Sequence, residues 1–90
     1  MFIRHFSKNI PTSVRMQVWG KYIGLKHGLS NCWCCKTIPI SQFNFECGHV
    51  VSRKDNGLTN IENLRPICGL CNKSMGTENM LHFMKKYDIK

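Results

Sequence analysis

Apolar residues recur at helical spacing near both ends of the chain and in short alternating runs near its centre. Between residues 12 and 23 they lie three or four positions apart, at Val14, Val18, Trp19, Tyr22 and Ile23. This spacing predicts a helix from about residue 12 to Tyr22 with one apolar face. Thr12 or Ser13 is a suitable N-cap, and Gly24 is expected to end the helix. We expect Trp19 and Tyr22 to pack in the core rather than to stack against bases.

The centre of the chain predicts two extended segments joined by a turn. Residues 43–51 alternate between apolar and polar side chains at their start and predict a strand. Residues 55–57, Asp-Asn-Gly, supply a turn, because Asn and Gly tolerate a positive φ. A second extended segment is expected over Thr59–Arg65. Pro66 is expected at its end, because proline donates no hydrogen bond to a neighbouring strand.

The remaining segments complete an α+β outline. Residues 1–12 predict a short strand or an extended arm. A short helix is expected near Cys71–Met75, and Thr77 is expected to cap a last helix. The apolar stripe of that helix consists of Met80, Leu81, Met84 and Tyr87. The pattern thus predicts a single domain, in which an arm and helix in residues 1–31 pack on a core in residues 32–90 that includes the C-terminal helix.

Two Cys-x-x-Cys pairs, Cys32 with Cys35 and Cys68 with Cys71, carry the strongest chemical signal. A two-residue spacer lets one tight turn aim two thiolates at one ion, and two such turns complete the tetrahedral shell of zinc. A chain of 90 residues buries only a small core, so a further source of stability is expected. Structural zinc in small modules contributes about 10–16 kcal/mol of apparent binding free energy. We therefore predict a structural zinc site.

The other two cysteines, Cys34 and Cys47, are left over from this pattern. Cys47 is most simply a buried thiol, with the alternative that it displaces one of the four ligands. Six cysteines could also form three disulfides. However, Arg4 follows the first three residues at once, so no secretory leader is expected, and no apolar run approaches the ~20 residues of a membrane span. We therefore expect an intracellular, reducing compartment in which thiols bind metal.

The charge of the chain narrows the choice of partner. Thirteen Lys and Arg residues stand against five acidic residues, which gives a net charge of +8. Such an excess favours a polyanion, because basic side chains that neutralise phosphates release condensed counterions. A solubilising surface and an acidic protein partner are the alternatives. Beside a zinc module, the charge points to nucleic acid.

Two runs of the sequence carry a resemblance to a known family. Residues 43–51, Phe-Asn-Phe-Glu-Cys-Gly-His-Val-Val, and residues 63–72, Asn-Leu-Arg-Pro-Ile-Cys-Gly-Leu-Cys-Asn, resemble the HNH endonucleases. The resemblance is to the zinc-bound members with two Cys-x-x-Cys pairs. His49, Asn63 and Asn72 follow one another at intervals of 14 and 9 residues in the order of the family. More loosely, residues 73–77 and 79–80 are similar to small HNH-type proteins of large DNA viruses, which would place the protein in a host cytoplasm or nucleus.

This resemblance implies a ββα-metal fold that hydrolyses DNA phosphodiester bonds with one divalent cation, Mg²⁺ or Mn²⁺. His49 takes the position of the general base, for which a nearly neutral imidazole is suited. Asn63 takes the position that braces the loop and orients the backbone of the base. Asn72 takes the position of an oxygen ligand to the catalytic ion. Zinc on four thiolates has no open coordination position, so two metals with different roles are expected.

One position departs from the family pattern. In many members, the residue directly before the histidine is an aspartate that binds the catalytic ion. In this chain the residue at that position is Gly48. Glu46 lies two positions earlier and would project on the same face of a strand, so it is the candidate replacement. Glu78 is a less suitable donor. If neither carboxylate reaches the ion, the chain is alternatively a catalytically inactive module that binds nucleic acid or serves in a larger assembly.

The basic residues near these motifs are candidate DNA contacts. Arg53 and Lys54 flank the predicted turn after His49, and Arg65 and Lys73 lie on either side of the second cysteine pair. Contacts to phosphate position a protein without specifying sequence, so no target site is predicted. Ninety residues leave little room for recognition, and a second copy or a partner protein would extend it, but the residues require neither.

Overall fold

The computed structural model describes residues 10–89, and the predicted N-terminal strand or arm therefore lies almost wholly outside the described residues. The described part contains three α-helices, four short strands and two 3₁₀ turns. In chain order these elements are α2 (Thr12–Tyr22), β1 (Leu29–Asn31), β2 (Pro39–Ser41), β3 (Glu46–His49), η1 (Arg53–Asp55), η2 (Ile61–Asn63), β4 (Leu64–Ile67), α3 (Gly69–Met75) and α4 (Met80–Lys86).

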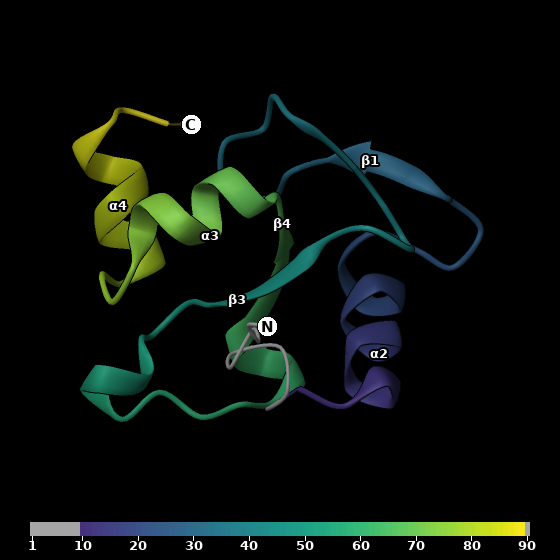
Figure 1. Cartoon of the computed structure of the whole chain (residues 1–90), viewed down its shortest axis with the longest axis horizontal. Coiled ribbons are helices and arrows are strands. Elements are labelled where there is room, and N and C mark those ends of the chain that lie inside the picture. Colours follow the sequence, from purple (N-terminus) through teal and green to yellow (C-terminus); the bar gives the residue numbers. More distant parts are fainter. Residues whose placement is uncertain (1–9, 90) are drawn as a thin grey trace, which may run out of the picture.

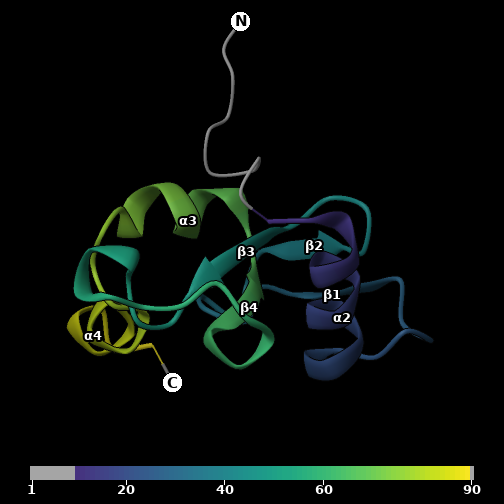
Figure 2. The ribbon, with the colours of Figure 1, turned by 90° about the horizontal axis from the view of Figure 1, so that it is seen from below.

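The strands form two separate antiparallel pairs, β1 with β2 and β3 with β4. The β3–β4 pair stands in the middle of the molecule, with α2 on one side and α3 and α4 on the other (Figure 1). The view from below shows the same arrangement, with α3 and α4 on one side of the β3–β4 pair and α2 on the other (Figure 2). The predicted α+β class is confirmed. The β1–β2 pair was not predicted, because strands of three residues carry too few positions to show alternation.

Helix α2 forms where the spacing of apolar residues predicts it, with Val18 and Trp19 buried. The expected cap is wrong, since the N-cap is Pro11 and no side chain caps the helix. The carbonyl of Pro11 instead accepts hydrogen bonds from the first free N–H groups. Trp19 is 1% exposed and its Nε1 donates to the carbonyl of His27 at 2.8 Å, so its role is in the core as expected. Gly24, at a φ of +119°, follows the end of the helix.

The β3–β4 pair is shorter than the two predicted extended segments. Glu46 pairs with Ile67 at one end and His49 with Leu64 at the other. The expectation of an extended chain over Thr59–Arg65 is wrong for its first part, where η2 precedes the strand. Pro66 lies inside β4 rather than at its end, and its carbonyl accepts a hydrogen bond from the N–H of Trp33. The backbone nitrogen and carbonyl of Pro66 both lie on the side of β4 that faces away from β3. The missing N–H of proline therefore removes no hydrogen bond between these two strands.

The C-terminal helix differs from the prediction in its cap and in its buried face. Asn79, not Thr77, is the N-cap of α4. Met80 and Met84 are buried as predicted, but Leu81 and Tyr87 are 60% and 61% exposed, and Phe83 is buried in their place. The three buried side chains, Met80, Phe83 and Met84, join one continuous core with residues of α2, β3, β4 and α3. None of the helices in the described part has the length and apolar character needed to span a bilayer.

Candidate functional site

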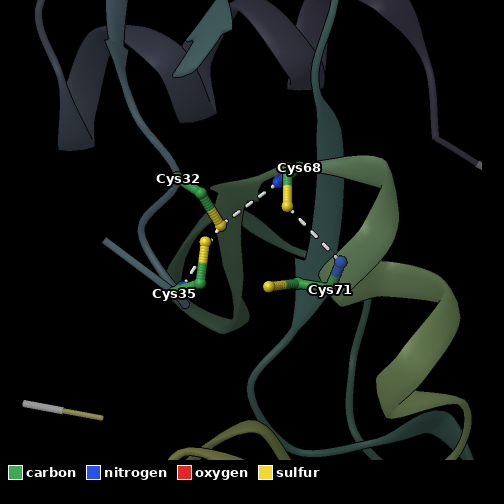
Figure 3. A group of neighbouring side chains, drawn as sticks. All are labelled: Cys32, Cys35, Cys68 and Cys71. Carbon is green, nitrogen blue, oxygen red and sulfur yellow. Dashed lines mark hydrogen bonds between the residues drawn. The ribbon is translucent and has the colours of Figure 1, made fainter. Parts of the chain in front are cut away.

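Four cysteines meet at the junction of the two strand pairs. Cys32 and Cys35 come from the turn after β1, and Cys68 and Cys71 come from the start of α3. Their sulfur atoms point toward one another (Figure 3) and all lie within 4.8 Å of each other. Lys36 adopts a φ of +66° directly after Cys35, which closes the first turn. These are the four residues that the sequence predicts as zinc ligands.

The geometry of the cluster fits a tetrahedral metal ion. Zn–S bonds of about 2.3 Å imply sulfur–sulfur distances of roughly 3.8 Å, which the cluster accommodates. Backbone N–H groups point at the sulfurs: Cys32 Sγ accepts from Cys34, Cys35 and Cys68 at 3.2–3.4 Å. Two further N–H groups, those of Ile38 and Cys71, donate to Cys35 Sγ and Cys68 Sγ at 3.4 Å. Such donors stabilise thiolates, the form that binds metal.

The two remaining cysteines lie outside this cluster. All six cysteines are free thiols, so the alternative of three disulfides is wrong. The alternative that Cys47 replaces one of the four ligands is also wrong, because the cluster forms without it. Burial raises the pKa of both Cys34 and Cys47 to about 11. They therefore remain protonated, apolar core residues at neutral pH.

A groove of about 770 Å³ runs past β3, η1 and α3. It brings together most of the residues that the sequence predicts for the site. Those that line it are Glu46, His49, Arg53, Lys54, Asn72 and Lys73. Arg15 and Glu78 also line it. His49 and Asn72 thus share one concave surface, although 23 positions separate them in the chain.

His49 is the last residue of β3 and is half-buried. Its Nε2 lies 2.9 Å from Thr59 Oγ1, a hydrogen-bond distance. Burial lowers the pKa of His49 below its ordinary value, and the positive charge of Arg53 lowers it further. Both effects disfavour the charged form, so the imidazole is neutral at neutral pH and can accept a proton.

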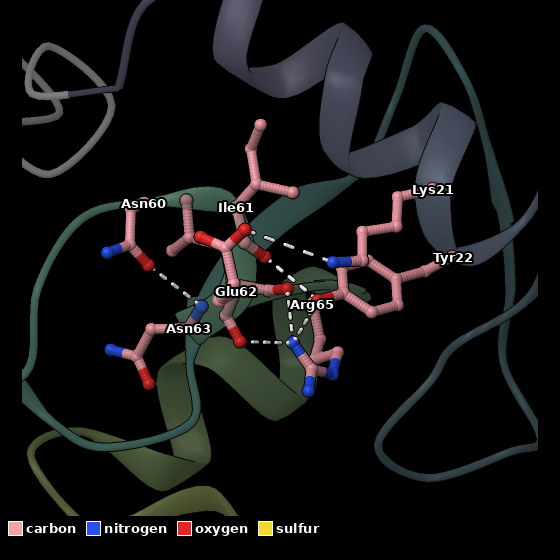
Figure 4. Close-up of polar contacts among 8 residues, drawn as sticks. Lys21, Tyr22, Asn60, Ile61, Glu62, Asn63 and Arg65 are labelled. Atoms are coloured by element: carbon pink, nitrogen blue, oxygen red, sulfur yellow. Dashed lines mark hydrogen bonds and ion pairs between the residues drawn. The ribbon is translucent and has the colours of Figure 1, made fainter.

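Asn63 does not line the groove but holds the loop that leads out of it. Its Oδ1 accepts a hydrogen bond from the N–H of Val51 at 2.9 Å. Its Nδ2 donates to the carbonyls of Val51 and Leu58 at 3.0 and 2.8 Å. Asn60 in turn fixes Asn63, because Asn60 Oδ1 accepts from the N–H of Asn63 (Figure 4). The amide of Asn63 therefore joins two separate backbone segments.

Comparison with known proteins identifies the family. Residues 30–78, more than half of the chain, match the family model described as HNH endonuclease. The chain belongs to the HNH endonuclease family. The matched segment contains the four clustered cysteines together with His49, Asn63 and Asn72. Comparison with curated proteins and with solved structures finds no match. The looser resemblance to small HNH proteins of large DNA viruses stays a prediction.

Gly48 is the position at which this HNH protein lacks the expected carboxylate. A Cβ on Gly48 would lie 2.4 Å from Ile67 Cδ1 and 3.1 Å from Met80 Cε. A side chain at position 48 would therefore point into the core, not into the groove. The expectation that Glu46 takes the place of residue 48 by sharing its strand face is thus wrong, although Glu46 itself lines the groove from the start of β3. A side chain here would require Ile67 and Met80 to shift from their present packing against β3.

Two carboxylates line the groove, and they differ in their partners. Glu78 is engaged with α4, because its Oε2 lies 2.6 Å from His82 Nδ1 and its Oε1 lies 3.3 Å from Lys86 Nζ. These two neighbours also lower the pKa of Glu78 against the opposing effect of desolvation. Glu46, at the start of β3, has no such ion pair among the contacts of the described residues. Asn72 follows Cys71 in α3 and presents an amide to the same groove.

Arg65 is the one predicted DNA contact that lies away from the groove. Its Nη1 donates to Tyr22 Oη at 2.7 Å and to the carbonyls of Glu62 and Leu64 at 2.9 Å. Its guanidinium lies 4.2 Å from the centre of the Tyr22 ring (Figure 4). These contacts tie α2 to β4, and we therefore leave Arg65 out of the proposed DNA interface.

Sequence reasoning missed two polar residues that shape the site. Thr59 contacts the ring of His49, and Asn79 Oδ1 accepts a hydrogen bond from the N–H of Ser52 at 2.7 Å. The N-cap preference of asparagine indicates where α4 begins but not this contact, because the side chain of Asn79 bonds to Ser52 and does not cap the helix. Thr59 carries no signal in the sequence, since only the closure of the loop brings it to His49.

Proposed function

We propose that this HNH protein is an endonuclease that hydrolyses DNA phosphodiester bonds with the help of one divalent cation. The observation that carries the proposal is the shared groove, in which the imidazole of His49 and the amide of Asn72 lie among basic side chains. Membership of the HNH endonuclease family supports the same reaction. The net charge of +8 supports a polyanionic substrate.

His49 is the proposed general base. Its neutral imidazole would take a proton from water, and the resulting hydroxide would attack phosphorus in line with the leaving 3′ oxygen. The lowered pKa of His49 favours this role, because it keeps a nitrogen lone pair free at neutral pH. General base catalysis of this kind contributes about 10²–10⁴-fold to the rate.

Asn72 and Glu46 are the proposed ligands of the catalytic ion. Amide and carboxylate oxygens are donors that Mg²⁺ and Mn²⁺ prefer, and both residues line the groove beside His49. When bound there, the ion would neutralise the charge that builds on the phosphoryl group and the leaving oxygen. Glu78 is a poorer donor, because His82 and Lys86 already occupy its carboxylate.

The four-cysteine cluster has a separate, structural role in this proposal. Four thiolates satisfy zinc completely and leave no position for water or phosphate. The cluster would fix the start of α3 to the turn after β1, and so hold Asn72, the residue after Cys71, at the groove.

Arg53, Lys54 and Lys73 are the proposed phosphate contacts. All three line the groove, and all three are exposed. Such contacts fix the position of the duplex without reading bases.

A second candidate is a nucleic-acid-binding module without catalytic activity. The packing of Gly48 favours it, because the groove has one carboxylate fewer than the family pattern provides. Both candidates predict salt-sensitive binding to DNA. Only the endonuclease predicts metal-dependent cleavage that requires His49.

Replacement of His49 separates these candidates. With supercoiled plasmid and Mg²⁺ or Mn²⁺, we expect the zinc-loaded protein to nick DNA and H49A to do so about 10²–10⁴-fold more slowly. The matched control is H27A, since His27 is exposed and does not line the groove. Equal nicking by H49A would remove His49 as the base. No nicking by the wild-type protein with either ion would favour the binding module.

The choice of carboxylate is tested by a pair of amide substitutions. We expect E46Q to raise the Mg²⁺ concentration needed for half-maximal nicking by about tenfold, because a charged ligand is lost. E78Q serves as the comparison and should change this requirement less, since Glu78 is held by His82 and Lys86. An equal or larger effect of E78Q would show that the ion lies nearer to Glu78.

A further inference from the structure

The loop between β3 and β4 folds back on itself beside His49. Asn56 adopts the left-handed conformation at a φ of +67°, and the N–H of Gly57 donates to the carbonyl of Ser52 at 2.8 Å. A Cβ on Gly57 would lie 1.8 Å from the carbonyl oxygen of Val51, so only glycine permits this approach. The closure returns the chain to the end of β3 and places residue 59 next to residue 49.

The amide of Asn63 fixes both sides of this closure. It hydrogen-bonds to the N–H and carbonyl of Val51, two residues after His49, and to the carbonyl of Leu58, one residue before Thr59. The backbone beside the imidazole and the backbone beside the threonine are therefore held to one side chain. The hydrogen bonds of Asn63 to Val51 and Leu58 thus hold His49 and Thr59 in contact.

The contact itself distinguishes the two nitrogens of the His49 ring. Nε2 lies 2.9 Å from Thr59 Oγ1. His49 lines the groove, whereas Thr59 does not, so Nε2 is bonded to a residue that lies outside the lining of the groove. A neutral imidazole has one donor nitrogen and one acceptor nitrogen, and the partner of one decides the role of the other.

We propose that Thr59 is a positioning residue, whose hydroxyl oxygen accepts a hydrogen bond from His49 Nε2–H and so keeps Nδ1 unprotonated as the nitrogen that takes the proton from water. This inference rests on the proposed function of His49 as general base. Proton transfer from water to Nδ1 yields hydroxide and an imidazolium ion. The Nε2–H bond to Thr59 then becomes charge-assisted and stronger. It therefore stabilises the transition state more than the ground state.

The opposite arrangement has a different consequence. If the Thr59 hydroxyl donated to Nε2, the ring proton would lie on Nδ1, and neither nitrogen could accept a proton from water in the groove. The tautomer of His49 in the resting protein is therefore the quantity that tests the proposal. It can be measured without any cleavage assay.

The first test is the ring tautomer in the zinc-loaded, ¹⁵N-labelled chain. Long-range ¹H–¹⁵N correlation spectra, at a pH where the imidazole is neutral, report which nitrogen carries the proton, and H49Q assigns the signals. We expect a single Nε2-protonated tautomer in the wild-type protein and in T59S, and a mixture of both tautomers in T59V. A wild-type ring protonated at Nδ1, or an unchanged ring in T59V, would overturn the proposal.

The second test is the rate of plasmid nicking. We expect T59V to lower kcat about five-fold with KM unchanged, which is the rate equivalent of one net hydrogen bond. T59S should restore the wild-type rate, and T12V, a matched change at an exposed threonine of α2, should leave it unaltered. An unchanged kcat in T59V would exclude a positioning role. Absence of nicking in the wild-type protein would count against the proposed function alone, because the tautomer result stands independently.

Discussion

Removal of the metal ion from the four-cysteine cluster should unfold this domain. The cluster joins segments that are far apart in the chain, as the hydrogen bond from Cys68 N–H to Cys32 Sγ across 36 positions shows. Its apparent binding free energy, about 10–16 kcal/mol for a structural zinc, is comparable to the 5–15 kcal/mol by which whole domains are stable. The core of a 90-residue chain cannot replace a contribution of that size.

Circular dichroism melting before and after complete chelation measures this effect. We expect one zinc per chain in the native protein, a cooperative melt that chelation abolishes, and recovery when zinc is returned. C47A is the control, because Cys47 is buried but lies outside the cluster, and it should retain one zinc. Omission of Mg²⁺ should leave the melt unchanged. Cooperative melting that persists after full zinc removal would contradict a structural role for the ion.

Introduction of the aspartate that the family pattern leads one to expect at position 48 should destabilise the protein without raising its activity. The Cβ of that aspartate would meet Ile67 Cδ1 at 2.4 Å, and its carboxylate would enter the apolar space between Ile67 and Met80. Overpacking costs about 1–3 kcal/mol, and burial of a carboxylate without a partner adds to this cost. We expect a loss of roughly 3–5 kcal/mol in the free energy of unfolding.

Denaturant unfolding of G48D and of two comparison variants tests this expectation. G28D is the matched control, since a Cβ on Gly28 meets nothing within 4 Å, and it should change stability by less than about 0.5 kcal/mol. G48A carries the steric part of the effect without the charge and should fall between the two. A stable G48D with faster Mg²⁺-dependent nicking would show that position 48 turns to the groove.

Several features that depend on neighbours in the chain follow from the sequence, although the N-caps of α2 and α4 do not. Helix α2 follows from the spacing of Val18, Trp19 and the apolar residues around them. The four-cysteine cluster is indicated by two Cys-x-x-Cys pairs, because each turn aims two sulfurs by local geometry. The turn at Asn56 and Gly57 follows from the residue types that a positive φ and a close backbone approach require.

Features that depend on distant contacts were predicted less well. The sequence predicts Pro66 at the end of its strand, yet it lies inside β4, where its carbonyl accepts a hydrogen bond from the N–H of Trp33 in the first cysteine turn. Hydrophobicity alone predicts the apolar stripe of α4, and it does not distinguish Leu81 from Phe83. The position of α4 against the other helices decides that Phe83 is buried and Leu81 is exposed. The positive charge of Arg65 makes it a candidate DNA contact in the sequence. Its contacts with Tyr22 show instead that it joins α2 to β4.

Residues that are close in the chain were enough to suggest the HNH resemblance, the cluster of four cysteines and the candidate roles of His49 and Asn72. Residue type and short spacing carry that information, since ligand chemistry and helical or turn geometry act over a few residues. The folded chain was needed to show that Gly48 faces the core, that His49 and Asn72 share a groove, and that Thr59 meets the ring of His49. These relations depend on how the loop closes and how β3 packs, which is set by contacts between residues that are distant in the chain.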